Sequence, residues 1–144
     1  MSRLVLGLDV STSCTGICIL DADVTEPTNG NHIRLLDRIE FKKCKSFWDK
    51  ADVVEKKLSE FKNSGITEFC LEEPLLGFSK GMSSAATITT LMRFNGIASY
   101  IARCIFGTDP VYIAAASARK LAGVKFGPIR HRTFSKQTKS AKLP

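Results

Sequence analysis

Apolar runs separated by turn-forming residues divide the first part of the chain into three expected strands. Residues 4–10 (LVLGLDV) are typical of a buried strand, and residues 15–21 of a second strand that follows a tight turn over residues 11–14. The stretch 22–31 is rich in turn formers, and residues 33–41 can return as a third strand. The pattern therefore predicts three consecutive antiparallel strands.

A helix and a fourth strand are expected next. Ser46 is a good N-cap residue and Gly65 can close the helix that follows. A fourth strand is predicted over residues 67–72, and Pro74 stops it because proline cannot donate to a sheet ladder. Since a helix precedes this strand, it should run parallel to the first one. The apolar residues that recur on one face of the helix are Phe47, Ala51, Val54, Leu58 and Phe61.

The remaining periodicity predicts a long helix from about Ser83 to Phe106, a fifth strand over residues 110–114 and a short helix capped by Ser117. The whole order indicates an α/β domain over residues 1–125, with a five-stranded mixed sheet and helices on both faces. Residues 126–144 are a basic tail that we expect to be poorly ordered. The residues of the long helix expected to face inward are Ile88, Leu91, Ile97, Ile101 and Ile105.

Composition narrows the class of protein. The 144 residues are 44% hydrophobic and 24% charged, which is typical of one globular domain. No long apolar run predicts a membrane span, and Asp9 falls where a signal peptide needs its apolar segment, so we expect a cytoplasmic protein. The five cysteines include no CxxC pair, which argues against a disulfide framework or a zinc site.

The net charge of +7 is concentrated at the C-terminal end of the chain. A basic block of this kind can attract a polyanion such as nucleic acid, or it can simply be solvated, and charge alone leaves both interpretations open. Residues 110–144 contain no Asp or Glu, and their basic residues are Arg119, Lys120, Lys125, Arg130, Arg132, Lys136, Lys139 and Lys142.

Carboxylates stand at the ends of two of the predicted strands. Asp9 follows the first apolar run, and Glu72 and Glu73 end the fourth strand. If these strands are parallel neighbours, Asp9 and Glu72 lie side by side, and their repulsion is a cost that a bound cation removes. Carboxylate oxygens suit Mg²⁺ or Mn²⁺, which can promote phosphodiester hydrolysis. Turn capping is the alternative role for Asp9.

The segments LGLDVSTSCTG and FCLEEP, followed by a glycine-containing loop and a long helix, resemble the RuvC-like Holliday junction resolvases of the RNase H-like superfamily. The resemblance covers about residues 3–125. It implies an RNase H-like fold and a metal-dependent endonuclease that cuts branched DNA, such as four-way junctions, during recombination or repair. It also implies that Asp9 and Glu72 are the catalytic metal ligands, with Mg²⁺ or Mn²⁺. Strand alternation is expected to turn Glu73 to the opposite side of the sheet.

The same resemblance suggests residues that contact DNA. Phe78 and Lys80 lie in the loop that family members place against the junction, and Arg119 and Lys120 lie where the family has phosphate contacts. Family members act as dimers, and the side chains of the long helix that fall outside its inward stripe are either a homodimer interface or buried within the monomer. These side chains are Met92, Phe94 and Tyr100.

One departure from the family pattern is clear. RuvC-like enzymes complete the metal site with one or two Asp residues on a C-terminal helix, whereas this sequence has no acidic residue after Asp109. Asp109 itself is expected at the opposite end of the sheet from Asp9. This departure leaves three explanations: the chain is a fragment that lacks the last helix, it has lost catalysis and kept binding, or its final stretch is not the natural continuation. The second explanation makes a non-catalytic nucleic-acid-binding domain an alternative function.

A second alternative is an ATPase of the actin, sugar-kinase or Hsp70 type. In those enzymes the loop between the first two strands holds ATP phosphates through backbone amides and small hydroxyl side chains. This hypothesis does not account for LEEP, and the chain is too short for a two-domain cleft. The residues that it would explain are Ser11, Thr12, Ser13, Thr15 and Gly16.

Overall fold

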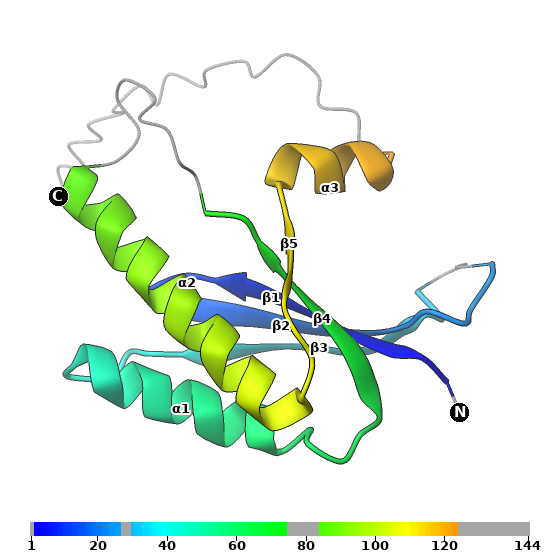
Figure 1. Ribbon diagram of the computed structural model, residues 1–144, viewed down its shortest axis with the longest axis horizontal. Coiled ribbons are helices and arrows are strands. Elements are labelled where there is room, and N and C mark those ends of the chain that lie inside the picture. Colours follow the sequence, from blue (N-terminus) through cyan, green and yellow to red (C-terminus); the bar gives the residue numbers. More distant parts are fainter. Residues whose placement is uncertain (1, 27–29, 75–83, 124–144) are drawn as a thin grey trace, which may run out of the picture.

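Five strands form one mixed sheet in the order β3-β2-β1-β4-β5 (Figure 1). The first three strands are antiparallel, β4 pairs with β1 in parallel, and β5 pairs with β4 in parallel. The computed structural model describes residues 2–26, 30–74 and 84–123. The predicted strand number and directions are confirmed. The strands are β1 (Leu4–Val10), β2 (Cys14–Asp21), β3 (Ile33–Glu40), β4 (Ile66–Glu72) and β5 (Val111–Ile113).

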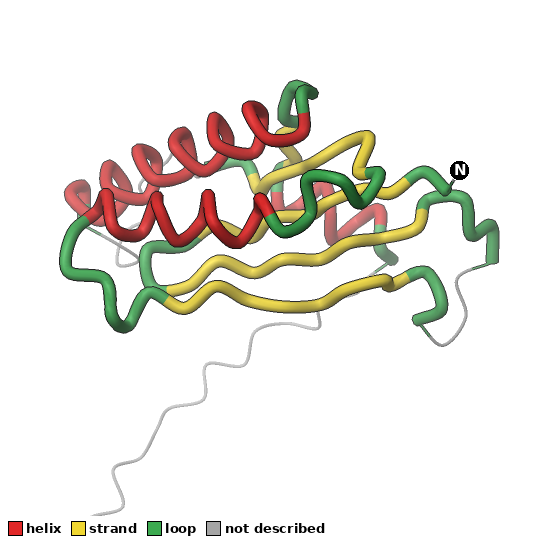
Figure 2. The backbone as a smooth tube through the Cα atoms, turned by 90° about the horizontal axis from the view of Figure 1, so that it is seen from below, coloured by secondary structure: helices red, strands yellow, loops and turns green. Residues whose placement is uncertain are grey.

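Two long helices cover one face of this sheet: α1 (Phe47–Ser59) and α2 (Ala85–Phe106), which lie side by side (Figure 2). The short helix α3 (Ala115–Leu121) follows β5 and, through Ala115 and Ala118, lines a pocket on the opposite face. Helices therefore lie on both faces of the sheet, the long α1 and α2 on one face and the short α3 on the other. Within the described residues, no helix is long and apolar enough to cross a membrane.

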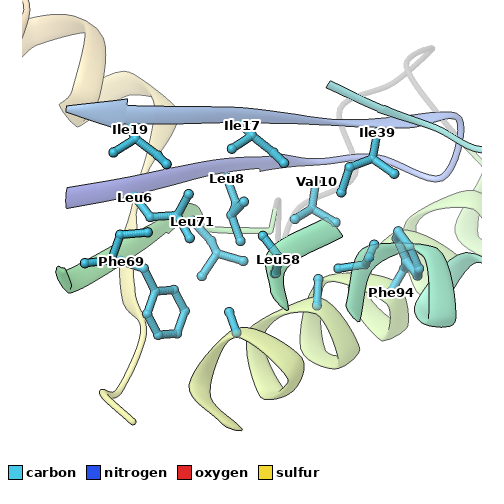
Figure 3. Packing of buried hydrophobic residues seen from close by; sticks show 14 of the residues in the cluster. Leu6, Leu8, Val10, Ile17, Ile19, Ile39, Leu58, Phe69, Leu71 and Phe94 are labelled. Carbon is cyan, nitrogen blue, oxygen red and sulfur yellow. The ribbon is translucent and has the colours of Figure 1, made fainter. Parts of the chain in front are cut away.

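Strand alternation explains why the two faces differ. In β1, Leu6, Leu8 and Val10 are buried, whereas Gly7 and Asp9 between them point to the other face. The buried set packs against α1 and α2 (Figure 3). We call the side under α1 and α2 the closed face and the other side the open face.

The beginning of α1 follows the prediction closely. Ser46 accepts a hydrogen bond from the backbone N–H of Asp49, and the Asp49 carboxylate accepts one from the backbone N–H of Ser46, which together form a capping box. The expected inner face is confirmed, because Ala51, Val54 and Leu58 are buried.

The predicted inward stripe of α2 is confirmed in part. Ile101 and Ile105 pack against the core but are only half-buried, as is Ile97. The fully enclosed positions are Phe94, Asn95, Ala98, Ser99 and Ala102. The prediction favoured large aliphatic residues, but small ones at the centre of the contact let α2 approach α1 and the sheet closely.

Phe94 decides between two alternatives that the sequence left open for α2. It is 0% exposed, and its ring meets those of Phe41 and Phe47 edge-on at 5.4 and 5.3 Å between centroids. It is therefore part of the core, and not an interface residue beyond the inner stripe as one sequence alternative had it.

Helix α3 is also corrected at its start. Its N-cap is Ala114, which makes no side-chain hydrogen bond, and Ser117 lies inside the helix. The preceding strand β5 is shorter than predicted, so the chain turns into the helix three residues earlier. The basic tail over residues 126–144 lies outside the described residues.

Candidate metal site

The open face of the sheet has a depression where β1 and β2 carry glycine. Gly7 pairs with Cys18 and Cys70 on its two neighbouring strands, and Gly16 pairs with Asp9. Because neither glycine has a side chain, the sheet forms the floor of a pocket of about 390 Å³ here. Its remaining lining comes from the strand ends and α3, and includes Asp9, Leu36, Asp37, Glu72, Ile113, Ala115 and Ala118.

The parallel pairing of β1 with β4 brings two of the predicted site residues together. The ladder matches Leu8 with Leu71, so Asp9 and Glu72 follow at corresponding positions at the C-terminal ends of adjacent strands. Both side chains are exposed and both line the pocket. Asp9 reaches the open face because it alternates with the buried Leu8 and Val10 in β1, and Glu72 is the last residue of β4.

The end of β4 is held in place by α2 and β5. The buried Asn95 side chain donates a hydrogen bond of 3.2 Å to the Glu72 carbonyl oxygen, and the Glu73 N–H donates to the Ile113 carbonyl at 2.9 Å. Asn95 thus fixes the backbone that carries the Glu72 carboxylate. Sequence reasoning missed this residue, although an Asn within the apolar periodicity of a helix was a signal that could have found it.

Glu73 lies apart from Glu72. It lines a different pocket, together with Pro74, Met92 and Tyr112 beside α2. This is the placement that strand alternation predicts for the residue after Glu72.

A third carboxylate, Asp37 on β3, also borders the Asp9–Glu72 pocket. Lys57 of α1 lies 3.1 Å from its carboxylate oxygen. A hydrogen bond from the Arg38 N–H and the neighbouring Lys57 ammonium lower the pKa of Asp37. Asp37 therefore already has a cationic partner, whereas no ion pair links Asp9 or Glu72 to another described residue.

The two thiols on the pocket floor are structural. Burial raises the pKa of Cys18, and burial together with the nearby Cys18 raises the pKa of Cys70. Both thiols are therefore protonated near neutral pH, where they are weak nucleophiles. All five cysteines are free, as the sequence predicted.

The predicted DNA contacts divide into two groups. Arg119 and Lys120 are exposed on α3, the helix that borders the pocket through Ala118. Phe78 and Lys80 lie outside the described residues.

Asp109 is paired with Arg103 at 2.6 Å and precedes β5, so it stands at the end of the sheet opposite Asp9, as predicted.

The turn between β1 and β2 is closed by its own hydrogen bonds. The Ser11 N–H donates to the Cys14 carbonyl, and the N–H groups of Ser13 and Cys14 donate to the Ser11 hydroxyl. Thr15 is 0% exposed and faces the closed side of the sheet. These amides and this hydroxyl are not presented to a phosphate, which counts against the ATPase hypothesis.

No protein-family model matches this sequence, and no curated protein matches it at a significant level. Among solved structures, RuvC from Thermus thermophilus in complex with a Holliday junction substrate aligns with a TM-score of 0.63 and 8% identity, over 82% of this chain and 68% of RuvC. The chain has an RNase H-like fold. A second Thermus thermophilus RuvC structure aligns with a TM-score of 0.53 and 11% identity, over 88% of this chain and 84% of RuvC. At these identities the likeness shows the RuvC-like fold alone.

The residues on this RuvC-like fold can accommodate a hard divalent cation. Mg²⁺ is commonly bound through one or two carboxylates, with waters and substrate phosphates completing an octahedron, and Asp9 and Glu72 offer such a pair. Among the described residues, no group of three or more His, Cys, Asp or Glu side chains is placed to hold a metal. The described site thus fits a cation shared with a phosphate better than one enclosed by protein ligands.

Proposed function

We propose that this chain is a metal-dependent endonuclease domain that hydrolyses phosphodiesters in branched DNA, such as four-way junctions. The observation that carries the proposal is that Asp9 and Glu72 line one open pocket at the ends of adjacent parallel strands. The likeness to a RuvC structure described with a Holliday junction substrate supports the choice of DNA.

Each residue then has a role. Asp9 and Glu72 hold Mg²⁺ or Mn²⁺, which supplies Lewis-acid stabilisation of the phosphate and an activated water. Arg119 and Lys120 bind backbone phosphates from the α3 side of the pocket, and Phe78 and Lys80 contact the junction from the loop after β4. Recombination or repair is the setting in which such a substrate arises.

Paired isosteric variants test this proposal. We expect Asp9→Asn and Glu72→Gln to abolish Mn²⁺ binding in calorimetry and Mg²⁺-dependent cutting of a labelled four-way junction, because each removes one ligand charge. Asp109→Asn and Glu73→Gln are the matched controls, since they change the same groups outside the pocket. Metal affinity that stays at the wild-type value in Asp9→Asn would refute the proposal.

A non-catalytic nucleic-acid-binding domain is the second candidate. The observation that favours it is the exposure of the basic residues Arg119 and Lys120 on α3, the helix that borders the pocket. It predicts salt-sensitive junction binding without cleavage in any divalent metal. Cleavage with turnover would exclude this candidate.

A homodimer would suit the two-fold symmetry of a four-way junction. With Phe94 buried, Met92 and Tyr100 are the exposed members of the proposed α2 interface. We expect Tyr100→Glu to shift the sedimentation coefficient from dimer to monomer, and a monomeric wild-type protein would contradict this part of the proposal.

A further inference from the structure

A basic segment with an exposed aromatic ring connects β3 to α1. Lys42, Lys43 and Lys45 are exposed in this connection, and Trp48 in the first turn of α1 is 67% exposed. We call these four residues the lysine–tryptophan patch. None of them belongs to the metal site or to the DNA contacts proposed above.

The patch lies beside the strand end that carries Asp9. The Phe41 N–H donates to the Ser13 carbonyl at 3.3 Å, and the Lys50 ammonium donates to the Thr12 carbonyl at 2.6 Å. Thr12 is three residues beyond Asp9, a path of about 10 Å along the chain at 3.3 Å per residue. In Figure 1 the end of β1 and the beginning of α1 lie on the same side of the molecule.

The charges in the patch are mostly uncompensated. The carboxylate that follows Trp48, Asp49, is occupied as the helix cap, accepting from the Lys45 and Ser46 N–H groups. Lys42 pairs with Glu40 at 3.2 Å, whereas Lys43 and Lys45 form no ion pair among the described residues. Two lysines are therefore available for an external anion.

The Trp48 ring is held in place although it is exposed. It packs edge-on against Phe47 at 5.8 Å between centroids, and Phe47 packs in turn against the buried Phe94. A fixed, exposed ring loses little conformational entropy when a flat group stacks on it.

From these observations we propose that the lysine–tryptophan patch binds a single-stranded stretch of nucleic acid at the same end of the sheet as the Asp9–Glu72 pocket, with a base stacked on Trp48 and phosphates on Lys43 and Lys45. An aromatic platform among lysines is the usual chemistry for single strands, because every base has a face that can stack. Paired bases in a duplex do not offer that face. The inference rests on the proposed nucleic-acid function and adds a second contact region to it.

Trp48 also reports on its own occupancy, because it is the only tryptophan of the chain. We expect a dodecamer of thymidylate, added without metal, to quench its fluorescence, and Trp48→Ala to weaken binding of the labelled dodecamer by about tenfold. Trp48→Phe should recover part of that loss. Lys43→Gln combined with Lys45→Gln should reduce the slope of log affinity against log salt by about 1.4, at about 0.7 per phosphate.

Lys62→Gln is the matched control, since Lys62 is exposed beyond the other end of α1 and should change the salt slope little. Absence of quenching, or equal affinity in Trp48→Ala and the wild type, would overturn the inference. If Trp48→Ala leaves junction cutting and dodecamer binding unchanged, the nuclease proposal stands and this one fails. If the dodecamer quenches Trp48 fluorescence but Asp9→Asn binds metal with wild-type affinity, the single-strand inference stands and the nuclease proposal fails.

Discussion

The two faces of the sheet use the same strands for different purposes. On the closed face, β1 contributes Leu6, Leu8 and Val10 to a core that α1 and α2 cover. On the open face, the alternate residues of β1 are Gly7 and Asp9, and they border a pocket. The packing that stabilises the fold is therefore on the closed face, and the proposed metal site is on the open face.

Because the core and the pocket lie on opposite faces, substitutions on the closed face should mainly change stability, and substitutions on the open face should mainly change ligand binding. Closed-face substitutions create cavities in a packed core and lower the free energy of unfolding. Open-face substitutions should change ligand binding with little loss of stability, because the short α3 is the only helix of the described part of the chain that borders this face. The predictions below probe that separation in order of decreasing effect.

The largest effect is expected on the closed face, at Phe94. Phe94→Ala removes a fully buried ring that contacts Phe41 and Phe47, and should lower the free energy of unfolding by about 3–5 kcal/mol. Trp48→Ala removes an exposed ring and should cost less than about 1 kcal/mol. Urea unfolding at pH 7 measures both, and a similar loss in the two variants would contradict the division.

The next effect is expected where the faces meet, at Asn95. Asn95→Ala leaves the Glu72 carbonyl without its donor and should lower the free energy of unfolding by about 1–3 kcal/mol. Because Glu72 is then less firmly positioned, metal affinity should fall as well. Ser99→Ala removes a neighbouring buried hydroxyl that donates to the Asn95 carbonyl and accepts from the Tyr112 hydroxyl, and should lower stability with little change in metal affinity.

A smaller effect is expected at Gly16, where a substitution should raise stability but weaken metal binding. Gly16→Ala should raise the free energy of unfolding by about 0.5–1 kcal/mol, because glycine is a poor strand residue. The added Cβ would stand 3.4 Å from the Asp9 Cβ and narrow the pocket, so metal affinity should fall. Gly96→Ala, on the outer side of α2 with open space around it, is the control for stability alone. A rise in both the free energy of unfolding and the metal affinity would contradict the prediction that an added Cβ at this position narrows the metal site.

Sequence reasoning succeeded where a local pattern was enough. The five strands, the N-cap at Ser46 and the neighbouring positions of Asp9 and Glu72 follow from alternation, cap residues and the direction of β4. It missed Asn95 and left Phe94 open between an interface and the core, because which side of α2 is buried depends on its packing against α1 as well as on the sheet. The ion pair between Asp37 and Lys57 was also beyond it, since it joins residues of two elements whose relative placement no local pattern specifies.

The smallest effect is expected from the cap of α1, at the exposed border of the closed layer. Hydrogen bonding with the Ser46 hydroxyl and with the Lys45 and Ser46 N–H groups lowers the pKa of Asp49. A carboxyl whose pKa is lower in the folded state stabilises the fold above its unfolded pKa of about 3.9, and this contribution is lost as pH falls through the folded value. Asp49→Asn should therefore reduce the drop in the urea midpoint between pH 6 and pH 3. Asp52→Asn, one turn further along the same helix and outside the capping box, should leave that drop nearly unchanged, and an equal reduction in both variants would mean that general helix charge, and not the cap, sets the acid sensitivity of α1.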